Sequence, residues 1–361
     1  MARTCNIDNA KQDFLAALRK AIQSANLNFL IGSGCSVPAI PVLGNIEKIV
    51  EEYNKAGKTT EADKQIFEFL SPFLKVSNQI LNTPEENVAK TLESYKSFLT
   101  VLSQVLFERK NNLLPRQASI FTTNYELFFE KAFEGIKTLA KLNDGFVRLP
   151  SLTGSFQFSS SEFFNSTYNN GNLYSYQVPI PAINLVKLHG SLSWKTDSNQ
   201  IIFHVDNYQE LISKYEKLSK EGSPEDISKF NTQFSFILPT KDKFRDTILN
   251  QTYYDLLRLY ANELDKENTL LLVDGFSFED EHIFEITKRG LKNPTLKIII
   301  FCHTAADLAG YNQKFSSYNN VDIVYSASKE IDFQLFSTII KEVLPADYKA
   351  DPVAQPGETH E

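Results

Sequence analysis

Residues 28–44, NFLIGSGCSVPAIPVLG, begin like a nucleotide-binding unit and then depart from its usual form. The mostly apolar residues 27–31 predict a short buried strand that runs into the turn Gly32-Ser33-Gly34. Glycine in such a turn lets backbone amides come close to a phosphate. Two prolines follow where a phosphate-binding helix normally starts. We therefore expect a phosphate site whose glycine turn leads into a loop.

The same plan of strand, turn and helix recurs outward from this stretch. Further strands are predicted in 118–122 and 234–239 and in NLVKLHG, NTLLLVDG, LKIIIFCH and VDIVYS, and helices in 9–25, 126–136, 206–221 and 251–266. The strands are rich in Ile, Leu and Val, which is typical of strands buried on both faces of a parallel sheet. The sequence thus predicts an α/β fold, namely a Rossmann-like, mostly parallel sheet with helices on both faces and a helical insertion.

Two insertions are expected within one domain that spans residues 1–348. Residues 46–112 are predicted to be helical, and one helix there begins with Thr83 as N-cap and Pro84 at its first position. Residues 150–182 are rich in Ser, Asn, Phe and Tyr without clear periodicity, and we expect a loop or lid.

Two further boundaries follow from glycine and proline. Gly290 comes after the helix predicted behind NTLLLVDG, and we expect it to close that helix as a C-terminal cap. Residues 349–361 contain two prolines and one glycine and are predicted to form a flexible C-terminal tail.

Charge and cysteine usage exclude several classes of protein. With 37 Lys+Arg against 44 Asp+Glu, the formal net charge is -7, so we expect no broad basic surface and no direct nucleic-acid site. The three cysteines, Cys5, Cys35 and Cys302, form no CxxC pair, which excludes the usual structural zinc frameworks and a disulfide scaffold. The histidines show no metal-ligand spacing, so no metal site is predicted.

The sequence also bears on location. No apolar run reaches the ~18 residues that a membrane helix needs, and the N-terminus lacks the apolar core of a signal peptide. Unpaired cysteines favour a reducing compartment. We expect a soluble, cytoplasmic protein without a membrane segment.

Four predicted strands end in residues that suit a ligand better than a core. These ends are Gly32-Ser33-Gly34 with Ser36, Thr122-Thr123-Asn124, His189-Gly190-Ser191, and Gly275 with Ser277. In an open parallel sheet, ligands gather at the carboxyl ends of the strands. We therefore expect these four ends to form one site.

The order of these motifs resembles that of the sirtuin-like NAD-consuming family. The family's opening Gly-Ala-Gly-x-Ser is similar to GSGCS at 32–36, and the Thr-Thr-Asn-Tyr-Asp of its prokaryotic branch to TTNYE at 122–126. KLHGS at 187–191 resembles the family's His-Gly motif, and GFSFEDEHI at 275–283 resembles its late Gly-x-Ser-x-x-Asp motif. The resemblance implies a single sirtuin-like Rossmann domain with NAD+ as substrate.

The resemblance also implies a role for each matched residue. Asn124 is the expected catalytic asparagine, which orients a water and a ribose hydroxyl, and His189 is the expected general base. Contacts with NAD+ are expected from Gly32, Ser33, Gly34, Ser36, Thr123, Glu126, Gly190, Gly275 and Ser277. Among these, the amides of residues 32–36 would hold the pyrophosphate, and Glu126 stands where the family's aspartate contacts the nicotinamide carboxamide. The loop after the glycine turn is expected to fold over NAD+.

Departures from the family point to one of its branches. Protein deacylases of the family carry two CxxC pairs for zinc and a Pro-Asp-Phe-Arg segment, whereas this chain has no CxxC pair and has IPVLGN instead. We therefore expect no zinc, and an NAD+ hydrolase of the branch found in bacterial antiphage defence systems. A free-standing chain of this size resembles the partners of HerA-type ATPases, and the resemblance implies a homo-oligomer.

Other interpretations stay open. In one alternative, the pocket binds NAD or ADP-ribose as a sensor and does not turn it over. In another, the protein is a protein deacylase or an ADP-ribosyltransferase. A nucleic-acid-cleaving subunit is the least favoured because the net charge is acidic. Taken singly, Asn124 also suits a turn or a helix N-cap, and His189 a hydrogen-bonded structural position. Cys35 suits a small residue that fills the turn, while Asp280 and His282 are interpreted as solvated or capping residues at a helix start.

Overall fold

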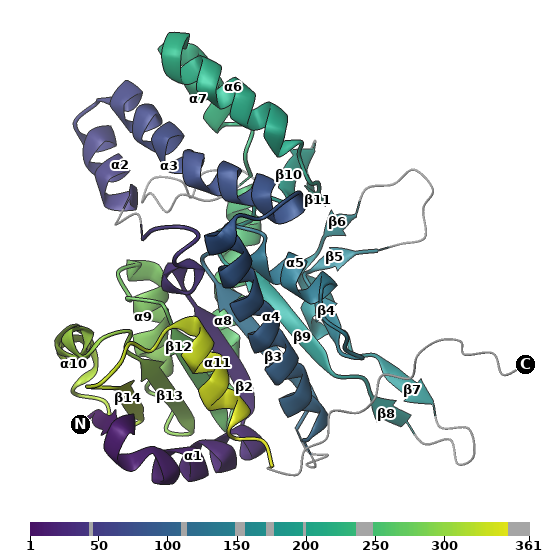
Figure 1. The fold of residues 1–361 in the computed structure, drawn as a ribbon, viewed down its shortest axis with the longest axis vertical. Helices are drawn as coiled ribbons and strands as arrows, with labels where there is room; N and C mark the ends of the chain where they lie inside the picture. The colour runs from purple at the N-terminus through teal and green to yellow at the C-terminus, as the bar shows by residue number, and fades with distance from the viewer. Residues whose placement is uncertain are drawn as a thin grey trace, which may run out of the picture.

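The fold is built on an eight-stranded sheet (Figure 1). The computed structural model describes residues 1–42, 46–109, 114–148, 156–170, 177–197, 200–235 and 248–345. In spatial order the strands are β1 (Arg3–Asn6), β14 (Val321–Tyr325), β13 (Leu296–Phe301), β12 (Thr269–Asp274), β2 (Asn26–Ile31), β3 (Gln117–Thr122), β9 (Ala182–Lys187) and β4 (Lys141–Asn143). All seven neighbouring pairs are parallel. The predicted α/β class with a mostly parallel sheet is confirmed.

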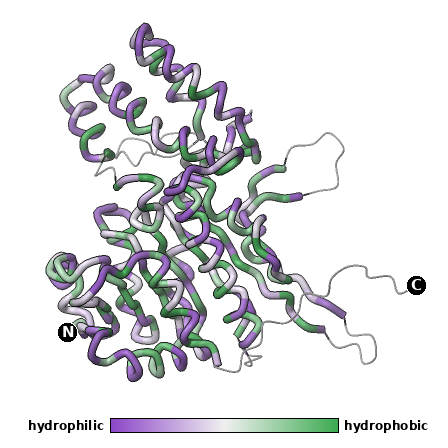
Figure 2. The backbone as a smooth tube through the Cα atoms, viewed as in Figure 1, coloured by the Kyte–Doolittle hydropathy of each residue, from purple (hydrophilic) through white to green (hydrophobic). Residues whose placement is uncertain are grey.

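Helices cover both faces of this sheet. One face carries α1 (Ile7–Ser24), α4 (Glu86–Phe107), α5 (Phe128–Glu134) and α11 (Phe333–Lys341), and the other carries α8 (Ile248–Asp265), α9 (Glu281–Gly290) and α10 (Leu308–Phe315). Side chains alternate along a strand, so Phe29 and Ile31 of β2 join the first core and Leu30 joins the second. Because both faces are buried, the central strands are mostly apolar (Figure 2), with Asn28, Ser119 and Asn184 as buried polar exceptions.

The order of the central strands fixes where a ligand can bind. From β2 the chain moves outward through β3 to β9, and it then returns to place β12 on the other side of β2. In doubly wound sheets, ligands occupy the crevice at this reversal, outside the carboxyl ends of the strands. The ends of β2 and β12 are therefore the expected place for a site.

Further helices lie above that edge of the sheet (Figure 1). They are α2 (Ile46–Lys55), α3 (Thr59–Leu81), α6 (Tyr208–Glu221) and α7 (Pro224–Asn231). Phe67 of α3 stacks on Tyr215 of α6 at a centroid distance of 4.2 Å and meets the edge of Phe230 of α7 at 5.4 Å. Helix α4 behaves differently, since its Phe98 packs on Phe29 of the sheet at 5.2 Å. The region predicted as a helical insertion thus contributes both to the upper layer and to the main core.

Two predicted helix caps are wrong. The N-cap of α4 is Glu85, not Thr83, because the chain is still extended there and the Glu85 amide donates to the side chain of Gln79 on α3. Gly290 is the last residue of α9, whose C-cap is Leu291. A Cβ at Gly290 would lie 2.9 Å from that of Leu264, so glycine there permits close packing of α9 on α8.

Small antiparallel pieces flank the main sheet. They are a sheet of β10 (Trp194–Asp197), β11 (Gln200–Phe203), β6 (Gln157–Phe158) and β5 (Phe146–Val147), and the pair β7 (Tyr168–Asn170) and β8 (Gln177–Pro179). Of the predicted loop or lid, residues 156–170 and 177–182 are described and carry some of these strands with the 3₁₀ turn η2 (Ser160–Phe164). The other lid residues, most of the strand predicted at 234–239 and the predicted tail 349–361 lie outside the described residues.

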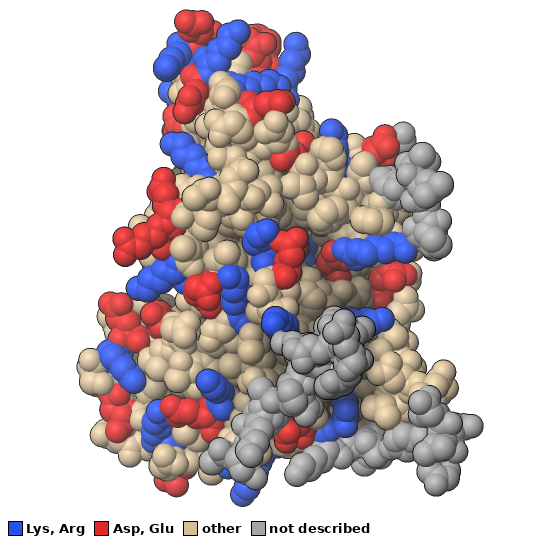
Figure 3. Space-filling view, turned by 45° about the vertical axis from the view of Figure 1, so that its right-hand side comes forward, with Lys and Arg blue, Asp and Glu red and all other residues tan. Residues whose placement is uncertain are grey.

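The surface shown in Figure 3 carries Lys and Arg interspersed with Asp and Glu. No helix within the described parts of the chain is long and apolar enough to cross a bilayer.

Candidate active site

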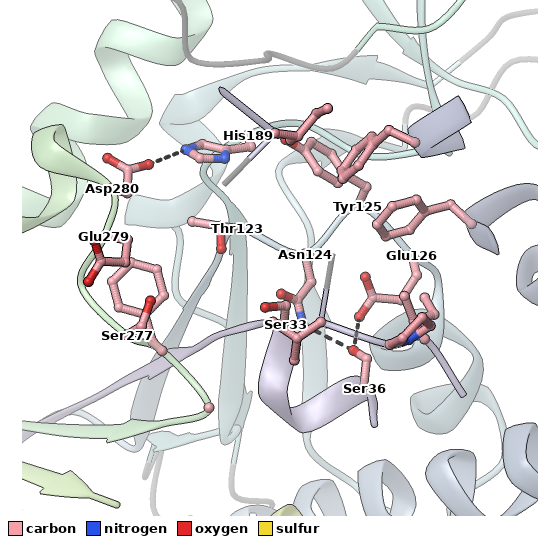
Figure 4. Close-up of a pocket in the computed structure, with 18 residues that line it drawn as sticks. Ser33, Ser36, Thr123, Asn124, Tyr125, Glu126, His189, Ser277, Glu279 and Asp280 are labelled. Atoms are coloured by element: carbon pink, nitrogen blue, oxygen red, sulfur yellow. Dashed lines mark hydrogen bonds and ion pairs between the residues drawn. The ribbon is translucent and has the colours of Figure 1, made fainter. Parts of the chain in front are cut away.

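The four predicted strand ends meet at one edge of the sheet, because they follow the neighbouring strands β12, β2, β3 and β9. A cavity of about 330 Å³ opens there (Figure 4). Its size falls near the lower end of the roughly 300–1,000 Å³ typical of small-molecule pockets. Eight of the predicted site residues line it: Ser33, Ser36, Thr123, Asn124, Glu126, His189, Gly275 and Ser277.

An apolar wall faces these polar groups. The loop after β2 supplies Ile40, Pro41 and Val42, and α3 supplies Phe69 and Phe73. The sequence predicted a loop behind the glycine turn, and here its described part forms one side of the cavity. The aromatic residues of α3 were not predicted as site residues, because their spacing is equally that of a packed helix.

The glycine turn packs directly against the turn after β12. A Cβ at Gly32 would overlap the carbonyl of Gly275, and one at Gly34 would lie 2.8 Å from the Gly275 Cα. Gly275 itself has φ +64°, a conformation that favours glycine. Close approach of the two backbones therefore requires glycine at these positions.

Several amides of the turn are already engaged. The Gly32 amide donates to the Asp274 carbonyl and the Gly34 amide to the Gly275 carbonyl, both at 3.0 Å, while the Cys35 amide donates to the Gly32 carbonyl at 3.1 Å. A pyrophosphate at this turn would therefore have to compete with internal acceptors for these three amides. Gly32 and Gly34 do not line the cavity, nor does Gly190, which turns the chain after β9 at φ +82°.

Asn124 stands at the centre of the polar wall. Its Nδ2 donates to the Gly32 carbonyl at 3.0 Å and to Ser36 Oγ at 3.2 Å, and the residue is 4 % exposed. Its Oδ1 is buried and has no hydrogen-bond partner among the described residues. A buried acceptor without a partner is uncommon, and one in a cavity wall suits a water or a ligand hydroxyl. Asn124 does not cap α5, whose N-cap is Leu127.

A buried hydroxyl network holds Ser36 and Glu126. Ser36 Oγ donates to Glu126 Oε1 at 2.6 Å, and the Tyr95 hydroxyl of α4 lies 2.9 Å from Ser36 Oγ and donates to the same carboxylate oxygen at 3.3 Å. Burial, with the Glu126 charge nearby, raises the pKa of Tyr95 well above its usual value, so the phenol stays protonated. Tyr95 lies in the region predicted only as a helical insertion, and it was not predicted as a site residue.

The buried side chain of Lys187 links the segment after β3 to the segment after β9. Its Nζ donates to the Glu126 carbonyl and, at 3.1 Å, to Ser191 Oγ, and it pairs with Glu130 at 2.9 Å. Burial raises the pKa of Glu130, and the neighbouring ammonium partly offsets this effect. The positions of the Asn124 and His189 loops are thus coupled through one buried cation.

His189 contacts a carboxylate that sequence analysis did not assign to the site. Its Nε2 lies 2.9 Å from Asp280 Oδ2, and the two side chains are 3 % and 7 % exposed. Asp280 is also the N-cap of α9, because its other oxygen accepts the Ile283 amide at 3.0 Å. Burial raises the pKa of Asp280, but His189 and that amide outweigh burial, and the net pKa is lowered. The capping interpretation is confirmed, whereas the solvated one is wrong.

Cys35 fills the turn as expected and has a buried partner. Its thiol donates to Asp274 Oδ2 at 3.2 Å, and burial raises the pKa of Cys35 well above its usual value. The protonated thiol is a poor nucleophile. Across the described residues, no group of three or more His, Cys, Asp or Glu side chains is arranged to hold a metal ion.

The SIR2-like domain family matches residues 118–323, more than half of the 361-residue chain. The matched region contains the strand ends that carry Asn124, His189 and Gly275, while the Gly32 turn precedes it. No match was found among curated proteins. The chain belongs to the SIR2-like domain family.

Proposed function

We propose that this protein hydrolyses NAD+ to ADP-ribose and nicotinamide. One observation carries the proposal: Asn124 and His189 line the same cavity, and Asn124 presents a buried, unpartnered acceptor there. Family membership supports a nicotinamide dinucleotide as the ligand.

Hydrolysis of the bond between nicotinamide and ribose does not need a strong nucleophile. Water oxygen forms a bond to C1′ of the ribose, the bond from C1′ to the pyridinium nitrogen breaks, and its electron pair leaves with nicotinamide. Nicotinamide departs neutral, and the attacking water loses one proton. What the protein must supply is a placed water, a proton acceptor and a site from which bulk water is largely excluded.

Asn124 and His189 suit the first two tasks. The amide of Asn124 cannot act as a base near neutral pH, but its Oδ1 can accept from a water or a ribose hydroxyl while its Nδ2 stays fixed on Gly32. Neutral His189 would take the proton released as the C1′–oxygen bond forms, a contribution typically worth about 10²–10⁴ in rate.

The two walls of the cavity support a ligand with one flat ring and one polar sugar. Among the lining residues, Phe69 and Phe73 offer aromatic surface, and Thr123, Asn124 and Ser36 offer hydroxyls and an amide. A few convergent polar groups within an apolar pocket are typical of small-molecule sites.

Two expected contacts need revision within this proposal. Glu126 Oε1 already accepts from Ser36 and Tyr95, so a contact with the nicotinamide carboxamide would compete with those hydroxyls. Contacts of NAD+ with Gly32 and Gly34 would use atoms other than their amides, which donate within the protein.

The wider setting is part of the same proposal. The motif order and the lack of CxxC pairs favour a bacterial antiphage effector that depletes NAD+ in the cytoplasm. In this setting the chain would assemble with copies of itself and act with a HerA-type ATPase. Nicotinamide release measured with and without such an ATPase tests this extension.

The central experiment compares NAD+ consumption by the wild type, Asn124→Ala and His189→Ala. Both variants are expected to lose nicotinamide release while the cooperative unfolding transition remains. His204→Ala serves as the matched control, because His204 is 44 % exposed and does not line the cavity.

Three outcomes would replace the proposal. Unchanged NAD+ loss in both site variants removes the assignment of the site. Calorimetric binding of NAD+ without nicotinamide release indicates a regulatory binding subunit. Transfer of label from NAD+ to a protein, or deacylation of a labelled acyl-peptide, indicates a transferase or a deacylase.

A further inference from the structure

We propose that Asp280 is the positioning residue of His189: it holds the imidazole with its proton on Nε2 and leaves Nδ1 as the atom that accepts the proton. This inference rests on the proposed hydrolysis for its catalytic meaning. It also concerns a tautomer that can be measured without turnover.

The first support is geometric. His189 follows β9 and Asp280 begins α9, so two elements far apart along the chain deliver the pair to one side of the cavity (Figure 4). The Oδ1 of Asp280 is fixed by the Ile283 amide at 3.0 Å, and its Oδ2 lies 2.9 Å from Nε2. Each carboxylate oxygen thus has its own neighbour, and the helix start sets the direction of the carboxylate.

The second support is burial. A capping aspartate needs one oxygen and normally keeps the other in water. Asp332, the N-cap of α11, follows that pattern: it is exposed and accepts the Leu335 amide at 2.8 Å. The Asp280 side chain is instead 7 % exposed and faces an imidazole that is 3 % exposed. Burying a second carboxylate oxygen against His189 is more than capping requires.

Chemistry then fixes the tautomer. An ionised carboxylate only accepts hydrogen bonds, and a neutral imidazole carries one donor nitrogen and one acceptor nitrogen. Nε2 and Asp280 Oδ2 lie 2.9 Å apart without the alignment of a hydrogen bond in this structure. We expect the proton on Nε2 to complete that bond, which leaves the lone pair on Nδ1. Once His189 has taken a proton, the imidazolium lies against a carboxylate. The rings of Tyr125 and Tyr253, with centroids 6.2 and 6.0 Å from that of His189, limit solvent screening of this pair.

Asp280→Asn separates positioning from capping. Asparagine caps helices as well as aspartate does, so α9 is expected to keep its start. With its oxygen on the Ile283 amide, the new side chain would present an NH₂ group to Nε2. Nε2 must then accept, and the proton moves to Nδ1. We expect kcat for nicotinamide release to fall by about 10²–10⁴-fold, the usual contribution of a general base, with little change in KM. Asp332→Asn is the matched control and is expected to keep the wild-type kcat.

The tautomer gives an independent readout. Nitrogen-15 NMR of histidine-labelled protein resolves the two ring nitrogens, and the His189 signals are assigned by their loss in His189→Ala. The chain has only five histidines, which makes the assignment practical. We expect the Nε2–H form in the neutral wild type and the Nδ1–H form in Asp280→Asn.

The outcomes distinguish the two proposals. An Nδ1–H tautomer in the wild type, or full kcat in Asp280→Asn alongside an inactive His189→Ala, overturns the role of Asp280 and leaves the hydrolase intact. A wild type that releases no nicotinamide, with its tautomer as expected, removes the hydrolase and retains Asp280 as the residue that orients His189.

Discussion

The side-chain amide of Asn124 donates to the backbone carbonyl of Gly32 at 3.0 Å, so the end of β3 is fastened to the end of β2. This bond keeps the amide from rotating freely, and it leaves Oδ1 without a partner among the described residues. The glycine turn itself therefore orients Asn124, the proposed catalytic asparagine, and the two motifs act as one unit.

Asn124→Asp tests this orientation. A carboxylate cannot donate a hydrogen bond to the Gly32 carbonyl. In the variant, a carboxylate oxygen would instead face the carbonyl oxygen, and both atoms are acceptors. We expect a loss of about 1–3 kcal/mol in the free energy of unfolding, from a buried carbonyl left without its donor. Nicotinamide release should fall by about 10²-fold or more, because displacement of a reacting group by about 1 Å has that effect. Urea denaturation and initial rates measure both, and wild-type values for both would contradict the orienting role.

Tyr95→Phe tests whether α4 supports the site. The variant removes a hydroxyl that contacts Ser36, Glu126 and, at 3.4 Å, Asn124. We expect kcat to fall roughly 5- to 30-fold and the free energy of unfolding by about 1–2 kcal/mol, the usual range for one or two buried hydrogen bonds.

Tyr208→Phe is the matched control for that change. Its hydroxyl is equally buried and donates to the Leu192 carbonyl at 3.0 Å, but Tyr208 does not line the cavity. A similar loss of stability with unchanged kcat is expected. Equal effects of the two variants on kcat would show that Tyr95 acts only through stability.

Much of this site could be predicted because local rules place it. Gly32, Asn124, His189 and Gly275 lie at or just beyond the ends of runs rich in Ile, Leu and Val, and a parallel sheet gathers such ends at one edge. The same alternation of strands and helices sufficed for the fold class. Strand order was not predicted, since it depends on long-range pairing.

The missed contacts depend on residues far apart in the chain. Tyr95 and Ser36 are 59 positions apart, and nothing in an apolar helix stripe distinguishes a tyrosine with a buried partner from one that only packs. Asp280 stands at the start of a predicted helix, and a capping role alone accounted for an aspartate there. Its contact with His189 was therefore not predicted. Its place within the Gly-x-Ser-x-x-Asp motif was the available signal. Strands β5 and β6 have two residues each, too few for an alternating pattern.

Gly275→Ala tests the contact between the two turns. The added Cβ would lie 2.6 Å from the Cys35 nitrogen at a residue with φ +64°. Gly57→Ala is the matched control, because Gly57 has φ +71° and nothing within 4 Å of an added Cβ. The control should lose about 1 kcal/mol from backbone strain. We expect Gly275→Ala to lose a further 1–3 kcal/mol or so, the typical effect of overpacking, and to lose NAD+ turnover. Equal stability losses in thermal melts would show that the turns can separate freely.

Asp274 gives the protein a stability that depends on pH. Burial, only partly offset by the Cys35 thiol that donates to it, raises the pKa of Asp274 from 3.8 to about 7. Below pH 4 the carboxyl is protonated in both the folded and the unfolded state, and its favourable contribution is complete. Between pH 4 and 7 the unfolded chain releases the proton while the folded chain retains it, so this contribution is lost as pH rises. A pKa difference of this size corresponds to a free energy on the order of 4 kcal/mol.

Asp274→Asn tests this pH dependence, because asparagine can still accept from Cys35 but cannot ionise. Urea denaturation at pH 5 and at pH 7.5 should show a smaller decrease in the free energy of unfolding for the variant than for the wild type. The same decrease in both proteins would mean that Asp274 titrates near its usual pKa and that the turn tolerates a charge beneath it.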